Sequence, residues 1–256
     1  MATVEEAPLI APAVPPLVAL RDAGLIDQVV VVDGVSPDST MRTMRALGAE
    51  VHRPAALLPG FGPVLGRGDV LWRALSVLEG DLVCFVDPEP AGIADAACEL
   101  LGPLAGDAAL QFVTGVRSGG GGRVGALTAR PLLDAFYPEL SVLRQPLSTE
   151  FAARRELLEE LTFGTGHGVE IALLLDACAS AGLDAVAQVE ISARSDRQRP
   201  LEGEGDVAAD VLGAVTQRLR RDGRLACGSR EPEVTERPAL GSAGCSVVVR
   251  PSRGCL

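Results

Sequence analysis

The sequence QVVVVDGVSPDS, residues 28–39, places a strand signal directly before a helix signal. Residues 28–33 are apolar on both faces of an extended chain, as a strand is when helices cover both sides of its sheet. After this run, Ser36 can cap a helix and Pro37 can open it. The order of strand, turn and helix predicts one βα unit of a mainly parallel sheet.

The same alternation continues along the chain. Apolar spacing predicts further strands over 49–53, 82–86, 110–116 and 185–191. It predicts further helices over 69–78, 123–133, 150–161, 169–182 and 206–220. Beyond about residue 227, Gly, Ser, Pro and charged residues dominate, which predicts a disordered or loosely attached tail. The whole pattern predicts an α/β fold.

Composition restricts the class of protein. The 256 residues, 47% of them hydrophobic, are enough for one sizeable domain or two small ones. A formal net charge of −11 disfavours binding to nucleic acid or to an anionic membrane surface. No apolar run approaches the ~20 residues of a membrane span, and the N-terminus lacks the pattern of a signal peptide. We therefore expect a cytoplasmic protein.

The first candidate site follows the predicted strand 82–86. Asp87 and Glu89 flank Pro88 there, and open α/β sheets bind ligands at the carboxyl ends of their strands. Such a pair of carboxylates can hold Mg²⁺ against a diphosphate. The alternative is an ordinary surface turn.

Two further residues are candidates for the same ligand. Asp33 also ends a predicted strand and can face a nucleotide base or ribose. Arg67 lies between two glycines, which would let the backbone approach a phosphate closely. The alternative for Arg67 is a solvated loop charge.

A glycine run precedes the predicted helix 123–133. Residues 119–122 are all Gly and are followed by Arg123, so amide groups at a helix start and a guanidinium can together bind an anion. A flexible hinge would use the same glycines without a ligand.

The last two candidates lie near the ends of predicted elements. Glu170, beside His167 at the start of an apolar helix, can accept hydrogen bonds from sugar hydroxyls, or it can be a capping charge. Residues 194–200 hold three arginines and Asp196, which can bind phosphate and complete a metal site, or form a solvated loop.

Taken in order, these motifs resemble those of the glucosyl-3-phosphoglycerate synthases, which are retaining glycosyltransferases of the GT-A fold. GRGDVLWRAL at 66–75, QPLSTEFAARRELL at 145–158 and GHGVEIALLLD at 166–176 carry much of the resemblance. The other matching segments are residues 25–40, 81–87, 120–133 and 182–200. Together they cover most of residues 5–220.

The resemblance implies a twisted, mostly parallel sheet flanked by helices, from which the first strand is missing. It divides the chain into a nucleotide-sugar half at 1–115 and an acceptor half at 116–226, and composition predicts the disordered tail at 227–256. It also implies Mg²⁺ or Mn²⁺ as the cofactor and a homodimer as the assembly.

The resemblance also implies a role for each matched position. Donor-binding residues are Glu6, Asp33, Gly34, Arg67, Asp87 and His167. Residues around the reacting sugar carbon are Leu147, Glu170 and Arg194. Acceptor-binding residues are Gly122, Arg123, Val124, Gly125 and Gln198. Metal ligands are Asp87, Glu89 and Asp196.

The expected function is metal-dependent transfer of a hexose from UDP-glucose or GDP-glucose to a small anionic acceptor, with 3-phosphoglycerate implied by the resemblance. The chain departs from the family pattern at Glu89, Gly125, His167, Asp196 and Gln198, and it has Arg67 where the family has lysine. These changes leave two alternatives open. One is a related transferase with another small-metabolite acceptor, and the other is a non-catalytic paralogue that binds nucleotide weakly.

Overall fold

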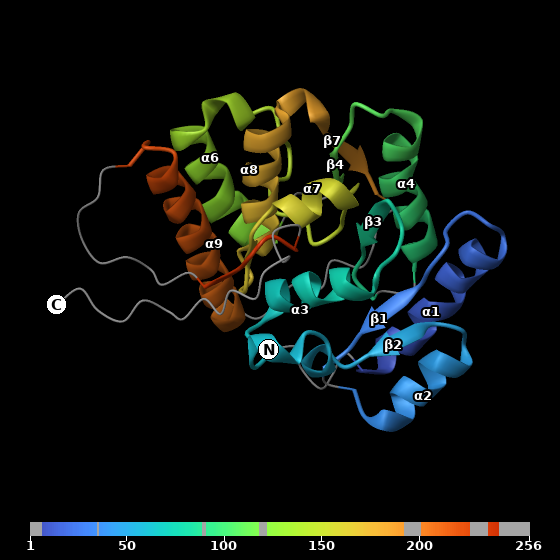
Figure 1. Cartoon of the computed structure of the whole chain (residues 1–256). Coiled ribbons are helices and arrows are strands. Elements are labelled where there is room, and N and C mark those ends of the chain that lie inside the picture. The colour runs from blue at the N-terminus through green and yellow to red at the C-terminus, as the bar shows by residue number, and fades with distance from the viewer. Residues whose placement is uncertain are drawn as a thin grey trace.

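The fold is described from a computed structural model that covers residues 7–34, 36–88, 91–117, 122–191, 201–225 and 235–240. Figure 1 shows two regions of the molecule. Helices α6, α8 and α9 lie on one side, and α1 and α2 lie beside strands β1 and β2 on the other. Helix α3 lies between these regions, near strand β3.

The first half alternates strands and helices, as predicted. Its helices are α1 (Ala7–Asp22), α2 (Asp38–Ala46), α3 (Arg67–Ala74) and α4 (Ile93–Gly106). Its strands are β1 (Val30–Val32), β2 (Glu50–His52), β3 (Leu82–Phe85) and β4 (Phe112–Val116). Short 3-10 turns, η2 (Pro54–Ala56), η3 (Pro59–Phe61) and η4 (Leu75–Val77), lie on either side of α3 in the sequence.

The second half is built around one buried helix. Its helical elements are α5 (Gly122–Val124), the π-turn η5 (Gly125–Ala129), α6 (Arg130–Phe136), η6 (Pro138–Leu140), α7 (Arg155–Glu160), α8 (Val169–Ala181), η7 (Leu183–Ala185) and α9 (Leu201–Arg221). Its strands are β5 (Phe151–Arg154), β6 (Phe163–Gly164), β7 (Val186–Glu190) and β8 (Glu236–Arg237). The side chains of residues 169–177 are all buried, because α8 is mostly apolar and lies inside the main core. Its two buried carboxylates, Glu170 and Asp176, are paired with Arg67 and Arg218.

Three sheets are present among the described residues. The largest has the strand order β3-β5-β4-β7, in which β3, β4 and β7 run in one direction and β5 runs against them. A second sheet pairs β1 with β2 in parallel, and a third pairs β6 with β8 antiparallel. Three of the four strands described in the main sheet share one direction, as predicted for a mostly parallel sheet, while β5 pairs antiparallel with both of its neighbours.

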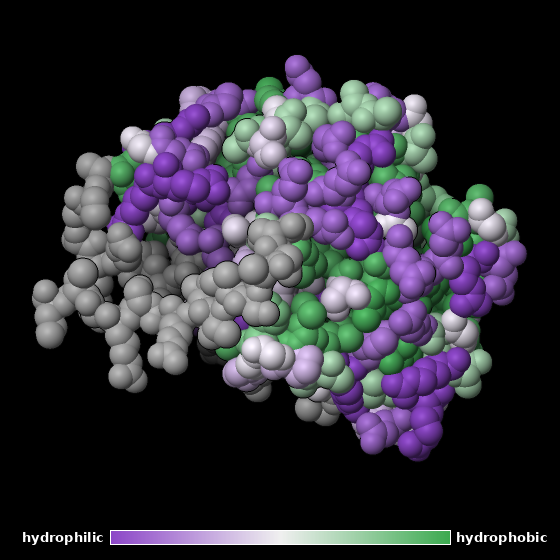
Figure 2. All heavy atoms as spheres, viewed as in Figure 1, coloured by the Kyte–Doolittle hydropathy of each residue, from purple (hydrophilic) through white to green (hydrophobic). Residues whose placement is uncertain are grey.

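Among the described strands, β1 and β3 lie at the edges of their sheets. Within the described ranges, β1 pairs with β2 alone and β3 pairs with β5 alone, so no described strand joins the two sheets. All three residues of β1 are half-buried. Figure 2 shows apolar surface gathered on the face where Figure 1 places α3, β1 and β3.

Strand β5 contradicts the helix predicted over 150–161. Residues 151–154 form a strand and only residues 155–160 are helical. Phe151 contacts Phe85 and Phe112 with ring centroids 5.0 and 5.3 Å apart, while its strand pairs with both β3 and β4. The helical spacing was misleading because pairing with two neighbouring strands outweighs local helix propensity.

The start of α2 also differs from the prediction. Ser36 does not cap this helix; Pro37 is the residue before its first turn, and it makes no side-chain cap. Instead, the amide of Ser36 donates a hydrogen bond to Oδ1 of Asp33, at 3.0 Å. The carboxylate of Asp33 therefore stabilises the turn between β1 and α2.

The prediction of a disordered or loosely attached tail beyond residue 227 is wrong for residues 235–240. Arg237 in β8 is buried, because its guanidinium contacts the buried carboxylate of Asp69. The carbonyl of Pro238 accepts a hydrogen bond from the indole of Trp72, at 2.9 Å. Short-range sequence patterns carry no signal for such contacts, because the partners are more than 160 positions away.

Among the residues that the structure describes, none of the helices has the length and apolarity that crossing a membrane requires.

Candidate functional site

Three residues predicted from sequence meet at the carboxyl end of β3. Arg67 begins α3, Asp87 follows β3 and Glu170 lies in the first turn of α8. The Nε atom of Arg67 lies 2.5 Å from Oε1 of Glu170, and its Nη2 atom lies 3.2 Å from Oδ1 of Asp87. Arg67 therefore bridges two carboxylates, which excludes the alternative of a solvated loop charge.

Thr149 is a fourth member of this cluster. Its hydroxyl donates a hydrogen bond of 2.6 Å to Oδ2 of Asp87, and its carbonyl accepts one of 3.2 Å from Nη2 of Arg67. The sequence analysis missed Thr149, because a threonine in a loop before a strand carries no pattern that indicates such a contact. Only the packing of distant segments shows it.

Two glycines fix Arg67 in place. Gly66 has a φ of +140°, which disfavours any other residue. A Cβ atom on Gly68 would lie 1.8 Å from the carbonyl oxygen of Gly164, so α3 packs directly on the backbone of β6. The amide of Gly68 donates to the carbonyl of Thr165 at 3.0 Å. In the structure these glycines let α3 lie close to the backbone at residues 164 and 165. The sequence had predicted that they let the backbone approach a phosphate.

The turn before α8 is equally tight. A Cβ atom on Gly166 or Gly168 would lie within 2.5 Å of an oxygen of Asp210 in α9. The amide of His167 donates a hydrogen bond of 2.7 Å to the carboxylate of Asp210. Asp210, which the sequence analysis did not identify, thereby holds the turn that positions Glu170.

The ionisation of the Arg67 and Glu170 pair follows from burial and charge. Burial lowers the pKa of Arg67, but the charges of Glu170 and Asp87 outweigh it and raise that pKa above its ordinary value. Burial raises the pKa of Glu170, and the nearby Arg67 offsets this only in part. Arg67 therefore stays charged and is the fixed positive charge of the cluster.

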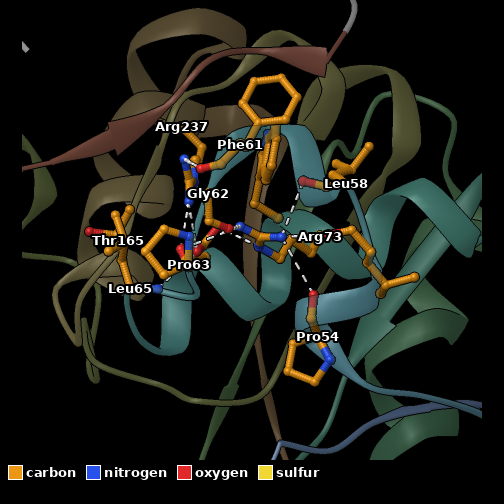
Figure 3. Close-up of polar contacts among 12 residues, drawn as sticks. Pro54, Leu58, Phe61, Gly62, Pro63, Leu65, Arg73, Thr165 and Arg237 are labelled. Atoms are coloured by element: carbon orange, nitrogen blue, oxygen red, sulfur yellow. Dashed lines mark hydrogen bonds and ion pairs between the residues drawn. The ribbon is translucent and has the colours of Figure 1, made fainter. Parts of the chain in front are cut away.

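A second buried cluster supports the loop that leads to Arg67 (Figure 3). Asp69 accepts hydrogen bonds from Arg73 at 3.1 Å and from Arg237 at 2.7 and 2.8 Å. The two guanidinium groups donate in turn to the carbonyls of Pro54, Leu57, Leu58, Phe61, Gly62 and Pro63. Arginine side chains therefore hold the loop between β2 and α3 in one shape.

The segment that contains Leu147 is anchored at Gln145. The side-chain carbonyl of Gln145 accepts a hydrogen bond from the amide of Arg117, at 2.8 Å, and its backbone carbonyl accepts one from Gln188, at 3.0 Å. Leu147 itself is half-buried and packs against the main core. This segment leads directly to Thr149 and so lies along the chain next to the cluster around Asp87.

The predicted acceptor residues Gly122, Arg123, Val124 and Gly125 form α5 and the start of η5. The side chain of Arg123 is 46% exposed and lies 3.4 Å from the carboxylate of Glu204 in α9. This exposure leaves the guanidinium accessible to a ligand from solvent. Glu204 was not identified from the sequence.

Of the predicted donor-binding residues, Asp33 is buried at the end of β1 and Gly34 is exposed. A Cβ atom on Gly34 would lie 3.3 Å from the ring of Pro54. Asp33 receives hydrogen bonds from Ser36 and, at its carbonyl, from Arg53. Its role toward a nucleotide stays a prediction.

Five predicted site residues lie outside the described residues, namely Glu6, Glu89, Arg194, Asp196 and Gln198. Within the described part of the chain, no group of three His, Cys, Asp or Glu side chains could hold a metal ion. Asp87 is therefore the one predicted metal ligand whose surroundings the structure describes.

Comparison with known proteins reveals the relatives of this chain. The chain is 39% identical over 211 residues to the glucosyl-3-phosphoglycerate synthase of Mycolicibacterium smegmatis, and the alignment covers 76% of this chain and 68% of that protein. The chain belongs to the glucosyl-3-phosphoglycerate synthase family. The synthase of Mycobacterium tuberculosis is 40% identical over 214 residues and that of Petrotoga mobilis is 37% identical over 219 residues. The alignments cover 76% and 78% of this chain, and the chain spans about 65% of the length of these two relatives. No family model matches the chain.

Solved structures agree with this membership of the glucosyl-3-phosphoglycerate synthase family. A mannosyl-3-phosphoglycerate synthase from Rubrobacter xylanophilus superposes with a TM-score of 0.83 at 35% identity, over 91% of this chain and 86% of that one. The Mycobacterium tuberculosis glucosyl-3-phosphoglycerate synthase in complex with Mn²⁺, UDP and phosphoglyceric acid gives 0.82 at 35% identity, over 93% and 87%. These matches confirm both the resemblance and the GT-A fold class predicted from the sequence.

Proposed function

We propose that this chain is a metal-dependent, retaining glycosyltransferase that moves glucose from UDP-glucose to 3-phosphoglycerate. One observation carries the proposal: Arg67 joins Asp87 and Glu170 at the carboxyl end of β3, in a chain that belongs to the glucosyl-3-phosphoglycerate synthase family. The Mycobacterium tuberculosis synthase has been crystallised with Mn²⁺, UDP-glucose and phosphoglyceric acid, which supports this choice of ligands.

The residues of the chain suit a hard divalent cation. Mg²⁺ and Mn²⁺ prefer carboxylate oxygens together with substrate phosphates. Asp87 presents such a carboxylate at a strand end, beside the charged Arg67. Glu89 and Asp196 would complete the protein ligands. When bound, the cation would neutralise charge that develops on the leaving diphosphate.

The proposal gives each predicted site residue one task. Arg67 adds positive charge beside the diphosphate, and Glu170 accepts hydrogen bonds from sugar hydroxyls, with His167 next to it. Arg123 and the amides of Gly122, Val124 and Gly125 hold the anionic acceptor. Leu147 lies beside the sugar through its backbone, and Arg194 and Gln198 assist at the diphosphate and the acceptor.

The transfer needs no protein nucleophile. The acceptor hydroxyl oxygen forms a bond to C1 of the sugar on the face from which the diphosphate leaves, and the bond between C1 and the diphosphate oxygen breaks. The hydroxyl proton passes to the departing diphosphate. The configuration at C1 is therefore retained.

A panel of donors and acceptors tests the proposal. Purified protein is incubated with UDP-glucose, GDP-glucose or GDP-mannose and with 3-phosphoglycerate or glycerol 3-phosphate, in Mn²⁺ or in EDTA, and products are identified by mass spectrometry. We expect glucosyl-3-phosphoglycerate from UDP-glucose in Mn²⁺ alone. Product from another acceptor only would identify a transferase of different specificity. Absence of product and of nucleotide binding in calorimetry would favour a non-catalytic paralogue and overturn the proposal.

Replacing the described metal ligand gives a sharper test. Asp87→Asn removes the charge and keeps the shape, so transfer should fall on the order of 100-fold or more and Mn²⁺ should no longer promote UDP binding. Asp95→Asn, at an exposed position in the first turn of α4, is the matched control. Full activity of the Asp87 variant would remove this residue from the site.

The homodimer and the division into donor and acceptor halves belong to the same proposal. Light scattering on the purified protein tests the dimer, for which we expect twice the 26.5 kDa mass of one chain.

A further inference from the structure

The carboxylate of Asp87 is held from two directions. Arg67 donates to Oδ1 at 3.2 Å, whereas the hydroxyl of Thr149 donates to Oδ2 at 2.6 Å. The second contact is the shorter one, and it comes from a segment 62 positions away in the sequence. The orientation of the Asp87 carboxylate therefore depends on where Thr149 lies.

Hydrogen bonds anchor the backbone beside Thr149. The carbonyl of Glu150 accepts hydrogen bonds from the amide of Gly115 in β4, at 3.0 Å, and from the hydroxyl of Ser148, at 2.9 Å. The side chain of Glu150 is fully buried and receives two hydrogen bonds from Arg117, at 2.6 and 3.0 Å. The segment that carries the Thr149 hydroxyl is therefore anchored to β4 and to Arg117.

We propose that Thr149 is a positioning residue, whose hydroxyl holds Asp87 in the orientation in which this carboxylate binds the divalent cation of the donor nucleotide. Carboxylates that ligate metals are commonly oriented by a hydrogen bond to their second oxygen, and loss of such a partner typically lowers metal affinity about 10-fold or more. The hydroxyl of Thr149 holds Oδ2 of Asp87, and this contact would fix the plane of the carboxylate when the cation is bound. The inference rests on the proposed function.

Thr149→Val isolates the hydroxyl. Valine has nearly the same shape, and the carbonyl that accepts from Arg67 is retained. Thr149→Ser keeps the hydroxyl, and Thr149→Ala serves if the valine variant does not fold. Thr43→Val is the matched control, because the side chain of Thr43 is exposed on α2 and its hydroxyl donates to the carbonyl of Ser39.

The readout is calorimetric binding of Mn²⁺ in the presence of saturating UDP, together with UDP binding in EDTA. We expect about 10-fold weaker Mn²⁺ binding for Thr149→Val, with values near wild type for Thr149→Ser and Thr43→Val. The affinity for UDP in EDTA should be equal in all four proteins. A structural role alone would instead weaken UDP binding in EDTA as well.

Three outcomes overturn the inference. The first is unchanged Mn²⁺ affinity in Thr149→Val, and the second is an equal loss of Mn²⁺ affinity in Thr149→Ser. The third is an equal loss of UDP affinity for Thr149→Val in EDTA. If wild-type protein binds no UDP in Mn²⁺, the proposed function fails as well. If the wild-type protein binds UDP with Mn²⁺ and transfers glucose, and the Mn²⁺ affinity of Thr149→Val equals that of wild type, only the role of Thr149 fails.

Discussion

The Nε atom of Arg67 lies 2.5 Å from Oε1 of Glu170, although the two residues are 103 positions apart in the sequence. This ion pair joins the start of α3, in the first half of the chain, to the start of α8, in the core of the second half. Burial of Glu170 makes the pair more than a surface contact, because a carboxylate without its cation would be costly there. The contact therefore contributes both to stability and to the charge of the site.

Arg67→Met tests this dual role. The variant leaves Glu170 and Asp87 without their shared cation, so the free energy of unfolding should fall by about 2 kcal/mol, between the values for exposed and buried pairs. Transfer should fall on the order of 100-fold. Urea unfolding and the product assay provide the two measurements. Arg144→Met, which loses an exposed pair with Glu190, should change neither. If Arg67→Met retained full activity, Arg67 would have no role at the diphosphate.

Asp69→Asn tests the buried cluster of Figure 3. Two buried guanidinium groups would lose their counter-charge, so unfolding in urea at pH 7 should require about 3 kcal/mol less free energy. Asp22→Asn, whose carboxylate is 63% exposed in its pair with Arg21, should cost less than about 1 kcal/mol. Equal costs for the two variants would contradict a buried ionic role for Asp69.

The contribution of Asp69 should also depend on pH. Burial raises the pKa of Asp69, but hydrogen bonds from Arg237, the Leu65 amide and Arg73 outweigh burial and hold that pKa below its ordinary value. A lowered folded-state pKa gives stability that is present above the unfolded value of about 3.9 and is lost as the pH falls through the folded value. The difference between wild type and Asp69→Asn should therefore be constant from pH 7 to about pH 5 and shrink below pH 4. A difference that grew in acid would contradict this sign.

Arg123→Gln tests the acceptor assignment. Loss of a charge-assisted hydrogen bond should weaken binding of 3-phosphoglycerate about 10-fold or more, with little change in the affinity for UDP in Mn²⁺. Glu204→Gln removes the partner of Arg123 and keeps the guanidinium, so acceptor binding should be unchanged or tighter. Calorimetry with each ligand separates the two. Equal weakening for donor and acceptor would show that Arg123 does not belong to an acceptor site.

Local sequence was sufficient to predict much of the fold, because the burial pattern of a single element is written in its own residues. The runs at β1 and β3, the apolar helix α8 and the carboxylate of Asp87 at a strand end are examples. Arg67 and Glu170 were also found from short motifs, although nothing local showed that they touch.

The remaining features depend on contacts between segments that are distant along the chain. Residues 151–154 form a strand because β3 and β4 pair with them from both sides. Arg237 is buried because Asp69 and the carbonyls of a distant loop accept its hydrogen bonds. Thr149 belongs to the site because folding brings its hydroxyl to Asp87. Such partners have no signature in sequence spacing, since hydrogen bonding and desolvation are set by whatever the folded chain places next to a residue.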